Sequence, residues 1–421
     1  MEFRKHHPDI KAIEKVVLPE PQKVMVNQTP VFIFPSEENI LKLKIIFKAG
    51  TWFQNKPLQA YFTNKMLCEG TAGFNSRKIA EKIDYYGAKL SLVAEEDWAS
   101  LTLFVSVNNF ENILPVLAEM ILMPAFPEKE FSIQKDITFQ NFVINNEKVA
   151  TLARNYFLEV LYGSSNYYGY RTKNEDFDTL HIHDLRTFHE EYYSLSDAMI
   201  IVSGKIGALE IKLMEKYLLA DSIASRKSKS KKRPFQPEEN KKLHIVRKNA
   251  LQTGIRIGKT LFNRTHADDL GFRFLNVVLG GYFGSRLMSN IREDKGYTYG
   301  IYSGLVSLQN SGYFSVFAEV GTPVYEKAVQ EVYKEIEELQ NNKIKEKELE
   351  TVRNYILGNF LRNSDGALNF SGIFENALLY GYDIDYFNKY LDTMQTINAD
   401  TLLSLAQKYL APLSMYEVTV G

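Results

Sequence analysis

The sequence predicts an α+β protein made of two tandem homologous domains, each a mostly antiparallel sheet with helices packed on one face. Three observations lead to this prediction. The chain has 421 residues, which is enough for two or three domains at roughly 150 residues each. Two pairs of segments repeat at nearly the same offset. Within a repeat, strand patterns come first, helix patterns follow, and a strand closes the unit.

The repeats indicate a duplication. FPEKEFSIQKD (126–136) aligns with IKEKELETVRN (344–354) at an offset of 218 residues. FHEEYYSLSDAMIIVSG (188–204) aligns with LAQKYLAPLSMYEVTVG (405–421) at an offset of 217 residues. Because the chain length is close to twice this offset, the simplest organisation is two copies of one unit of about 200 residues.

The domain boundaries follow from this duplication. We expect an N-terminal domain over residues 1–220, a basic linker over 221–242 and a C-terminal homologous domain over 243–421. A run of basic residues such as this one can bind acidic groups, but a solvated linker is the simpler interpretation. The run comes just before two prolines and consists of Arg226, Lys227, Lys229, Lys231, Lys232 and Arg233.

Hydrophobic periodicity predicts individual elements in each copy. Residues 41–48 and 100–107 alternate apolar with mostly polar side chains, as half-buried strands do. Apolar residues step by three and four over 329–339, which predicts an amphipathic helix, and residues 110–123 look like its counterpart in the first copy.

Composition excludes several classes of protein. With 50 basic and 51 acidic residues and an apolar share of 45%, the chain is not a dedicated nucleic-acid binder, a polybasic membrane protein or a disordered tail. Its lone cysteine, Cys68, cannot form an intrachain disulfide.

The first twenty residues lack the apolar run of a secretory signal, and no stretch of about 18 uncharged apolar residues occurs. We therefore expect a cytoplasmic protein that binds neither nucleic acid nor membrane.

Most catalytic motifs are absent. The sequence contains no H-E-x-x-H, H-x-x-E-H, G-x-S-x-G, P-loop or C-x-x-C pattern. The nearest approach is HIHDLRTFHEEYY, where His183 and His189 are six residues apart instead of the four that would place both on one helix face. His181 and His183 align with Asn398 and Asp400 of the second copy, so helix-start positions are the simpler interpretation.

One segment does indicate a site, namely SRLMSNIREDKGYTYGIYSG. Leu287 and Ile291 are four residues apart and would face the core, which leaves Arg292 off that face near the helix end. Gly296 would then break the helix, and Tyr299 would follow on an extended segment. An arginine and a tyrosine across such a corner can both donate hydrogen bonds to one carbonyl. From spacing alone, a surface arginine and a half-buried strand aromatic remain the simpler interpretation.

We call the segment around Arg292 and Tyr299 the Arg/Tyr corner. This corner, the duplication and the segment LQAYFTNKMLCEGT together resemble the insulinase/pitrilysin family of inverted-motif zinc peptidases. The likeness extends over nearly the whole chain and is closest to the two-domain, processing-peptidase-like subunits. SRLMSNIREDKGYTYGIYS closely matches the S-R-L and R-E-x-x-G-x-x-Y pattern of the family. LQAYFTNKMLCEGT (58–71) lies where active members carry H-x-x-E-H on a helix.

The resemblance also shows where this chain departs from the family. It places the two metal histidines on Tyr61 and Lys65, the catalytic glutamate on Asn64 and the distal glutamate ligand on Asn141. None of these four residues is an imidazole or a carboxylate, and an asparagine cannot take a proton from water. An ammonium facing a divalent ion at 4 Å would add about 8 kcal/mol of repulsion at an effective dielectric constant of 20. We therefore expect no zinc in this chain.

The same resemblance implies that Arg292 and Tyr299 contact the carbonyl of the peptide bond being cut. In some bacterial members the zinc helix and the Arg/Tyr pair belong to different subunits. We expect this chain to be a non-catalytic, substrate-positioning subunit of a heteromeric zinc endopeptidase acting on peptides or unfolded segments. The zinc would then be held by a homologous partner subunit. Two alternatives stay open: an inactive scaffold subunit, and a peptide-binding homodimer of the same fold without turnover.

Overall fold

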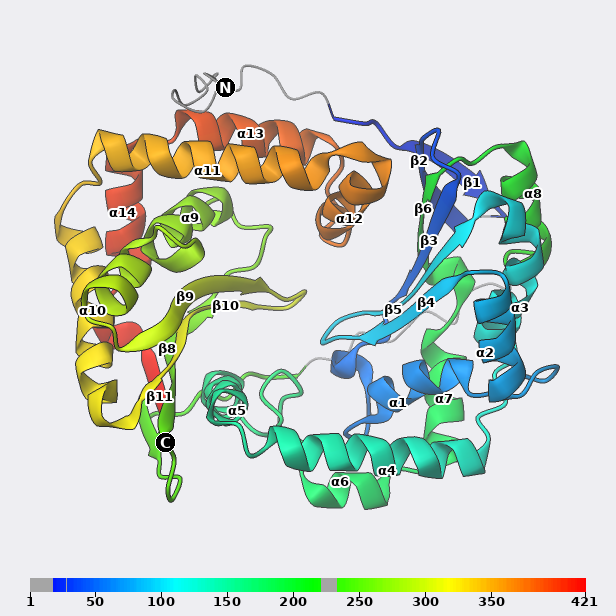
Figure 1. Ribbon diagram of the computed structural model, residues 1–421, viewed down its shortest axis with the longest axis horizontal. Helices are drawn as coiled ribbons and strands as arrows, with labels where there is room; N and C mark the ends of the chain where they lie inside the picture. The colour runs from blue at the N-terminus through cyan, green and yellow to red at the C-terminus, as the bar shows by residue number, and fades with distance from the viewer. Residues whose placement is uncertain (1–17, 28, 221–232) are drawn as a thin grey trace, which may run out of the picture.

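The computed structural model describes residues 18–27, 29–220 and 233–421, which form two halves, each built around its own sheet (Figure 1). Most of the predicted basic linker falls between the described ranges, including Arg226, Lys227, Lys229, Lys231 and Lys232. Arg233, the last residue of the run, is described. It is not free in solvent, because its guanidinium donates to the carbonyls of Trp52 and Gln54.

The first sheet has six strands in the order β1-β2-β6-β3-β5-β4. All neighbours are antiparallel except β2 and β6, which are parallel. The strands predicted over 41–48 and 100–107 are confirmed as β3 and β5. The strand bounds are β1 (Gln22–Val26), β2 (Thr29–Pro35), β3 (Ile40–Phe47), β4 (Lys89–Ala94), β5 (Ala99–Ser106) and β6 (Met199–Gly204).

Helices of the first half cover one face of this sheet. Leu41, Leu43 and Ile45 of β3 point to that face and are fully buried with side chains of α1, α3 and α7, as strand alternation requires. The helices in this part of the chain are α1 (Gln59–Lys65), α2 (Ser76–Tyr85), α3 (Phe110–Leu122), α4 (Glu128–Asn145), α5 (Val149–Tyr162), α6 (Asn174–Thr179), α7 (Ile182–Tyr192) and α8 (Ala208–Tyr217), of which α5 packs on the second sheet instead.

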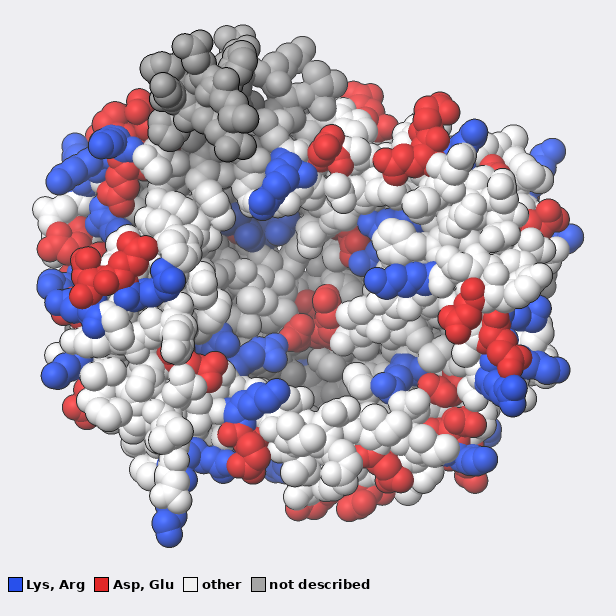
Figure 2. Space-filling model, in the orientation of Figure 1, with Lys and Arg blue, Asp and Glu red and all other residues white. Residues whose placement is uncertain are grey.

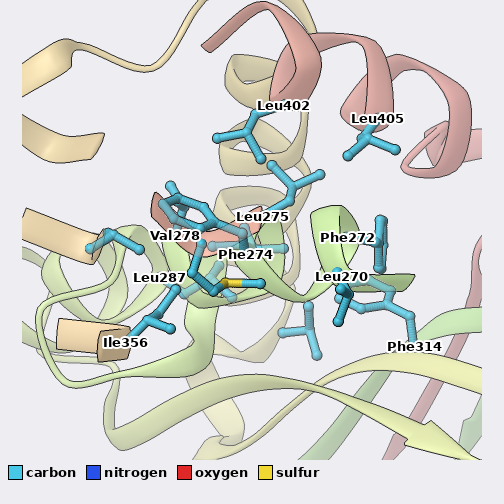
Figure 3. Packing of buried hydrophobic residues seen from close by; sticks show 14 of the residues in the cluster. Leu270, Phe272, Phe274, Leu275, Val278, Leu287, Phe314, Ile356, Leu402 and Leu405 are labelled. Carbon is cyan, nitrogen blue, oxygen red and sulfur yellow. The ribbon is translucent and has the colours of Figure 1, made fainter. Parts of the chain in front are cut away.

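The second sheet has five strands in the order β7-β11-β8-β10-β9, and only β7 and β11 are parallel. Figure 3 shows part of its core, where α9, α11 and α14 pack over the sheet. The strands are β7 (Lys242–Ile245), β8 (Gln252–Leu261), β9 (Thr298–Ser307), β10 (Gly312–Gly321) and β11 (Tyr416–Val420). The helices are α9 (Asp269–Asn276), α10 (Tyr325–Asn341), α11 (Glu346–Ser364), α12 (Gly366–Leu378), α13 (Asp385–Thr396) and α14 (Ala399–Tyr409).

The α+β prediction of two similar halves is thus confirmed, and the predicted helices over 329–339 and 110–123 lie in α10 and α3. Among the described helices, none is both long and apolar enough to cross a membrane.

Two helices are exchanged between the halves, which the sequence did not predict. Helix α5 packs on β8 and β11 of the second sheet, where Phe157 and Tyr162 are buried against Tyr313. Helix α12 packs on β2 and β6 of the first sheet, where Phe370 contacts Phe34 edge-on. Since α12 begins 217 residues after α5, at the offset of the sequence repeat, the exchange is reciprocal.

The remaining inner surface surrounds a hollow. Figure 2 shows the centre of this face hollowed, with charged side chains of both signs on its walls. In Figure 1 the tips of the β4–β5 and β9–β10 hairpins point toward each other across the middle of the molecule. They are joined there, because the backbone N–H of Gln309 donates to the Asp97 carboxylate at 2.8 Å.

Candidate functional site

The Arg/Tyr corner has the local structure that its sequence predicts. Leu287 and Ile291 are both completely buried in the second core, and residues Met288–Asp294 form one wide helical turn. The chain then reverses at Gly296, whose φ of +66° is readily accessible only to glycine. Strand β9 follows and carries Tyr299 at the edge of the sheet.

Arg292 and Tyr299 are brought together by this turn. The Arg292 Nε donates to the main-chain carbonyl of Tyr299 at 3.1 Å. Its Nη1 lies 3.7 Å from the Glu293 carboxylate, and its Cζ lies 4.5 Å from the ring centroid of Phe283. The Tyr299 side chain is 95% exposed. The guanidinium is therefore held from three sides, and the Tyr299 side chain is free to meet a ligand.

Sequence reasoning missed Phe283, an exposed aromatic residue that stacks on the guanidinium. Its segment, GGYFGSRL (280–287), predicts by sequence only a glycine-rich turn into a helix. The one available signal was a pair of aromatic residues inside that turn, where polar side chains are more usual.

Polar contacts attach the corner to two helices. The Asn290 amide donates to Glu331 at 2.8 Å and to Glu335 at 2.7 Å on α10. Arg286 makes a bidentate pair with Glu348 of α11 at 2.8 and 2.9 Å, a geometry that fixes direction as well as distance. Burial raises the pKa of Glu335, whereas the Asn290 hydrogen bond lowers that of Glu331. The corner is thus a rigid part of the second half.

The four positions that the resemblance assigns to zinc binding lie in the other half, on α1 and α4. Asn64 is 2% exposed, and its Nδ2 has no hydrogen-bond partner among the described residues. The buried Tyr193 phenol lies beside it, with a pKa raised by burial and lowered to a smaller extent by the Asn64 amide. Tyr61 and Lys65 are half-buried, and the Lys65 Nζ lies 5.8 Å from the Tyr61 ring centroid.

Helix α4 contacts α1 through the rings of Phe131 and Phe62, whose centroids are 5.4 Å apart. Asn141 is exposed further along α4. The four positions therefore offer a phenol, two amides and an ammonium, a set of groups that does not fit a zinc ion. Elsewhere in the described parts of the chain, no group of three or more His, Cys, Asp or Glu side chains is arranged to hold a metal.

The histidine segment proves to be a helix start, as the alignment of the two copies indicated. His181 precedes the first residue of α7, and its backbone N–H donates to Asp184 at 2.9 Å. The His189 Nε2 lies 2.8 Å from the Ile121 carbonyl, and burial lowers the pKa of this imidazole. These contacts account for both residues structurally.

Two domain models of one peptidase family match successive parts of the chain. The model described as Insulinase (Peptidase family M16) matches residues 36–165, and the model described as Peptidase M16 inactive domain matches residues 179–356. The chain belongs to the M16 (insulinase) peptidase family. The first match contains the substituted zinc positions, and the second contains Arg292 and Tyr299.

Curated relatives within the M16 family are named zinc proteases. The Bacillus subtilis protein named Uncharacterized zinc protease YmxG is 23% identical over 353 residues, covering 83% of this chain and 85% of that protein. A Rickettsia felis protein named Uncharacterized zinc protease is 22% identical over 387 residues, covering 87% of this chain and 89% of its own length.

Solved structures show the same fold. A peptidase M16 inactive domain from Pseudomonas fluorescens superposes with a TM-score of 0.86 at 24% identity, covering 95% of this chain and 98% of its own. A protease from Helicobacter pylori superposes with a TM-score of 0.87 at 17% identity, covering 96% and 100%.

Proposed function

We propose that this M16 family member is a non-catalytic, substrate-positioning subunit of a heteromeric zinc endopeptidase that acts on peptides or unfolded segments. In this proposal a homologous subunit with an intact H-x-x-E-H helix holds the zinc, and this chain supplies Arg292 and Tyr299. The assembly is a heterodimer or a larger complex of the two kinds of subunit.

The observation that supports the proposal most is the contrast between the two sites. The zinc positions carry Tyr61, Asn64, Lys65 and Asn141, which neither fit the metal nor supply a base. The corner, in contrast, holds the Arg292 guanidinium against the main-chain carbonyl of Tyr299, whose side chain is 95% exposed. A subunit with a purely structural role has no need for two such donors at the free edge of β9.

The chemistry of the corner suits an amide carbonyl. Negative charge builds on the oxygen of the scissile carbonyl as the carbon becomes tetrahedral, and donors already aimed at that position lower the barrier without reorganising. A guanidinium stays protonated at any working pH, and its Nη donors remain when Nε is engaged by the Tyr299 carbonyl. The Tyr299 hydroxyl adds one well-directed donor. Each group therefore positions and polarises the substrate without itself reacting.

Reconstitution tests the proposal. This chain is mixed with the M16 family member of the same organism that carries H-x-x-E-H, and the mixture is analysed by size-exclusion chromatography and with a fluorogenic peptide. We expect a complex of equal stoichiometry whose peptidase activity exceeds that of either chain alone. If the zinc-bearing chain is equally active with and without this chain, the positioning role is wrong and the scaffold alternative is favoured.

A further inference from the structure

A second candidate ligand site lies in the second half, and neither Arg292 nor Tyr299 is among the residues that line it. It is an open cavity of about 380 Å³ lined by residues of α9, α11, α12, α13 and β9, at the small end of the range for ligand pockets. Asn376 of α12 lines this cavity and also a neighbouring one of about 430 Å³ against the charged face of β3 and β5. The two cavities are therefore adjacent, one in each half.

Arg264 provides the charge of this cavity. It lies in the loop between β8 and α9, where the Tyr382 hydroxyl donates to its backbone carbonyl at 3.2 Å. Its Cζ lies 5.8 Å from the ring centroids of both Tyr380 and Tyr386. Its Nε is enclosed and has no hydrogen-bond partner among the described residues. No ion pair between described residues involves Arg264.

A second arginine in the same cavity serves as an internal comparison. The Arg273 Nε donates to Asp269 at 2.8 Å, and its Nη2 donates to Ser307 at 3.1 Å. Arg273 is therefore neutralised by the protein itself, whereas Arg264 is not. Because no aspartate or glutamate is among the residues that line the cavity, its lining carries a net positive charge.

The other lining residues suit a short stretch of peptide. Four asparagines contribute amide groups: Asn276, Asn359, Asn363 and Asn376. The Asn276 Oδ1 is buried without a hydrogen-bond partner among the described residues, which leaves one polar atom of the wall unsatisfied. Apolar walls come from Ile373, Phe387, Tyr390 and Met394, among others, and these can cover an apolar side chain.

We propose that this cavity binds a carboxylate of a bound peptide, with Arg264 as its counter-ion. The proposal rests on the proposed function, since it assumes that the chain holds peptides. A guanidinium and a carboxylate match geometrically and form the stronger, charge-assisted kind of hydrogen bond. The carboxylate is either the C-terminus of the peptide or the side chain of an Asp or Glu residue. The site would make the subunit select peptides by their charge.

Isothermal titration calorimetry of the full chain with three tripeptides at pH 7 tests the proposal. The probes are acetyl-Gly-Ala-Phe with a free C-terminal carboxylate, the same peptide as its C-terminal amide, and acetyl-Gly-Glu-Phe amide. We expect one of the two acids to bind about 10- to 100-fold more tightly than the uncharged amide. Tight binding of the first acid identifies a C-terminus, and tight binding of the second identifies a side chain.

Variants assign the effect to the cavity. Arg264→Gln should lower the affinity of the preferred acid to that of the uncharged amide. Asn363→Asp adds a negative charge at an exposed lining residue on α11, where folding is not at risk, and should also weaken acid binding. Arg77→Gln removes a surface arginine whose side chain is 86% exposed and should change nothing.

Equal binding of all three peptides, binding of none of them, or an unchanged affinity in Arg264→Gln and Asn363→Asp would each overturn the proposal. None of these outcomes bears on the gain of peptidase activity in the reconstituted complex. Failure of the carboxylate site and failure of the positioning role are therefore distinguishable.

Discussion

The backbone N–H of Gln309 donates to the Asp97 carboxylate at 2.8 Å, which ties the turn of one hairpin to the turn of another 212 residues away. The Tyr168 hydroxyl donates to the other carboxylate oxygen. Asp97 is only 5% exposed. Burial raises its pKa to about 6, although both hydrogen bonds act in the opposite direction.

Asp97 should therefore make the stability of the protein pH-dependent. Because its pKa is higher in the folded state than the ordinary value of about 3.9, the stability that it contributes is present below pH 4 and is lost as the pH rises through about 6. Asp97→Asn removes this titration. We expect the free energy of unfolding of the variant, relative to the unmodified protein, to rise by about 2 to 3 kcal/mol between pH 4 and pH 7.5. Urea unfolding at both pH values measures it, and a constant difference would contradict the pKa assignment.

Arg292→Ala and Tyr299→Phe, each made in this chain, should lower the turnover of the reconstituted complex. Loss of one preorganised donor to a developing oxyanion typically costs about 3 to 4 kcal/mol, or 100- to 1000-fold in turnover. The zinc content of the complex and its elution volume should stay the same.

Two neighbours serve as controls for this experiment. Lys295→Ala changes an exposed side chain, and Tyr297→Phe removes one hydroxyl from a half-buried ring. The family resemblance gives neither residue a role, so both variants should turn over at the unmodified rate. If all four variants do so, the corner contributes packing alone.

The packing of the exchanged helix α5 on β8 should be disturbed by one methyl group added to β8. A Cβ at Gly254 of β8 would lie 2.6 Å from the Val149 carbonyl oxygen, so the backbone of α5 would have to move. We expect Gly254→Ala to lower the free energy of unfolding by about 1 to 3 kcal/mol. Gly358→Ala is the matched control, because nothing lies within 4 Å of that Cβ and alanine in a helix interior stabilises by about 1 kcal/mol. Equal effects of the two substitutions would argue against the close packing.

The purified chain should contain no stoichiometric zinc and should hydrolyse no peptide by itself, because Tyr61, Asn64, Lys65 and Asn141 supply neither ligands nor a base. Metal analysis after dialysis and a fluorogenic peptide assay measure both properties. About one zinc per chain that survives dialysis would show that another set of residues binds the metal.

The sequence by itself determined the local structure of both sites. Alternation predicted β3 and β5, and the spacing of Leu287 and Ile291 with a glycine at 296 predicted a helix end, a turn and an extended segment, while the family resemblance was needed to pair Arg292 with Tyr299. The chemistry of the four positions that the resemblance assigns to zinc also follows from residue identity, because an ammonium, a phenol and two amides do not fit the metal.

Only the tertiary structure decided which surfaces meet. An amphipathic pattern shows that a helix buries one face but not which sheet covers it, so the exchange of α5 and α12 was not predictable from periodicity. The same holds for Asp97 and Arg264. The carboxyl of Asp97 has a raised pKa because a hairpin from the other half encloses it. Arg264 differs from Arg273 only in its surroundings, since an acidic partner lies beside one guanidinium and not the other. Desolvation and charge pairing depend on neighbours that are distant in sequence, and folding alone brings these together.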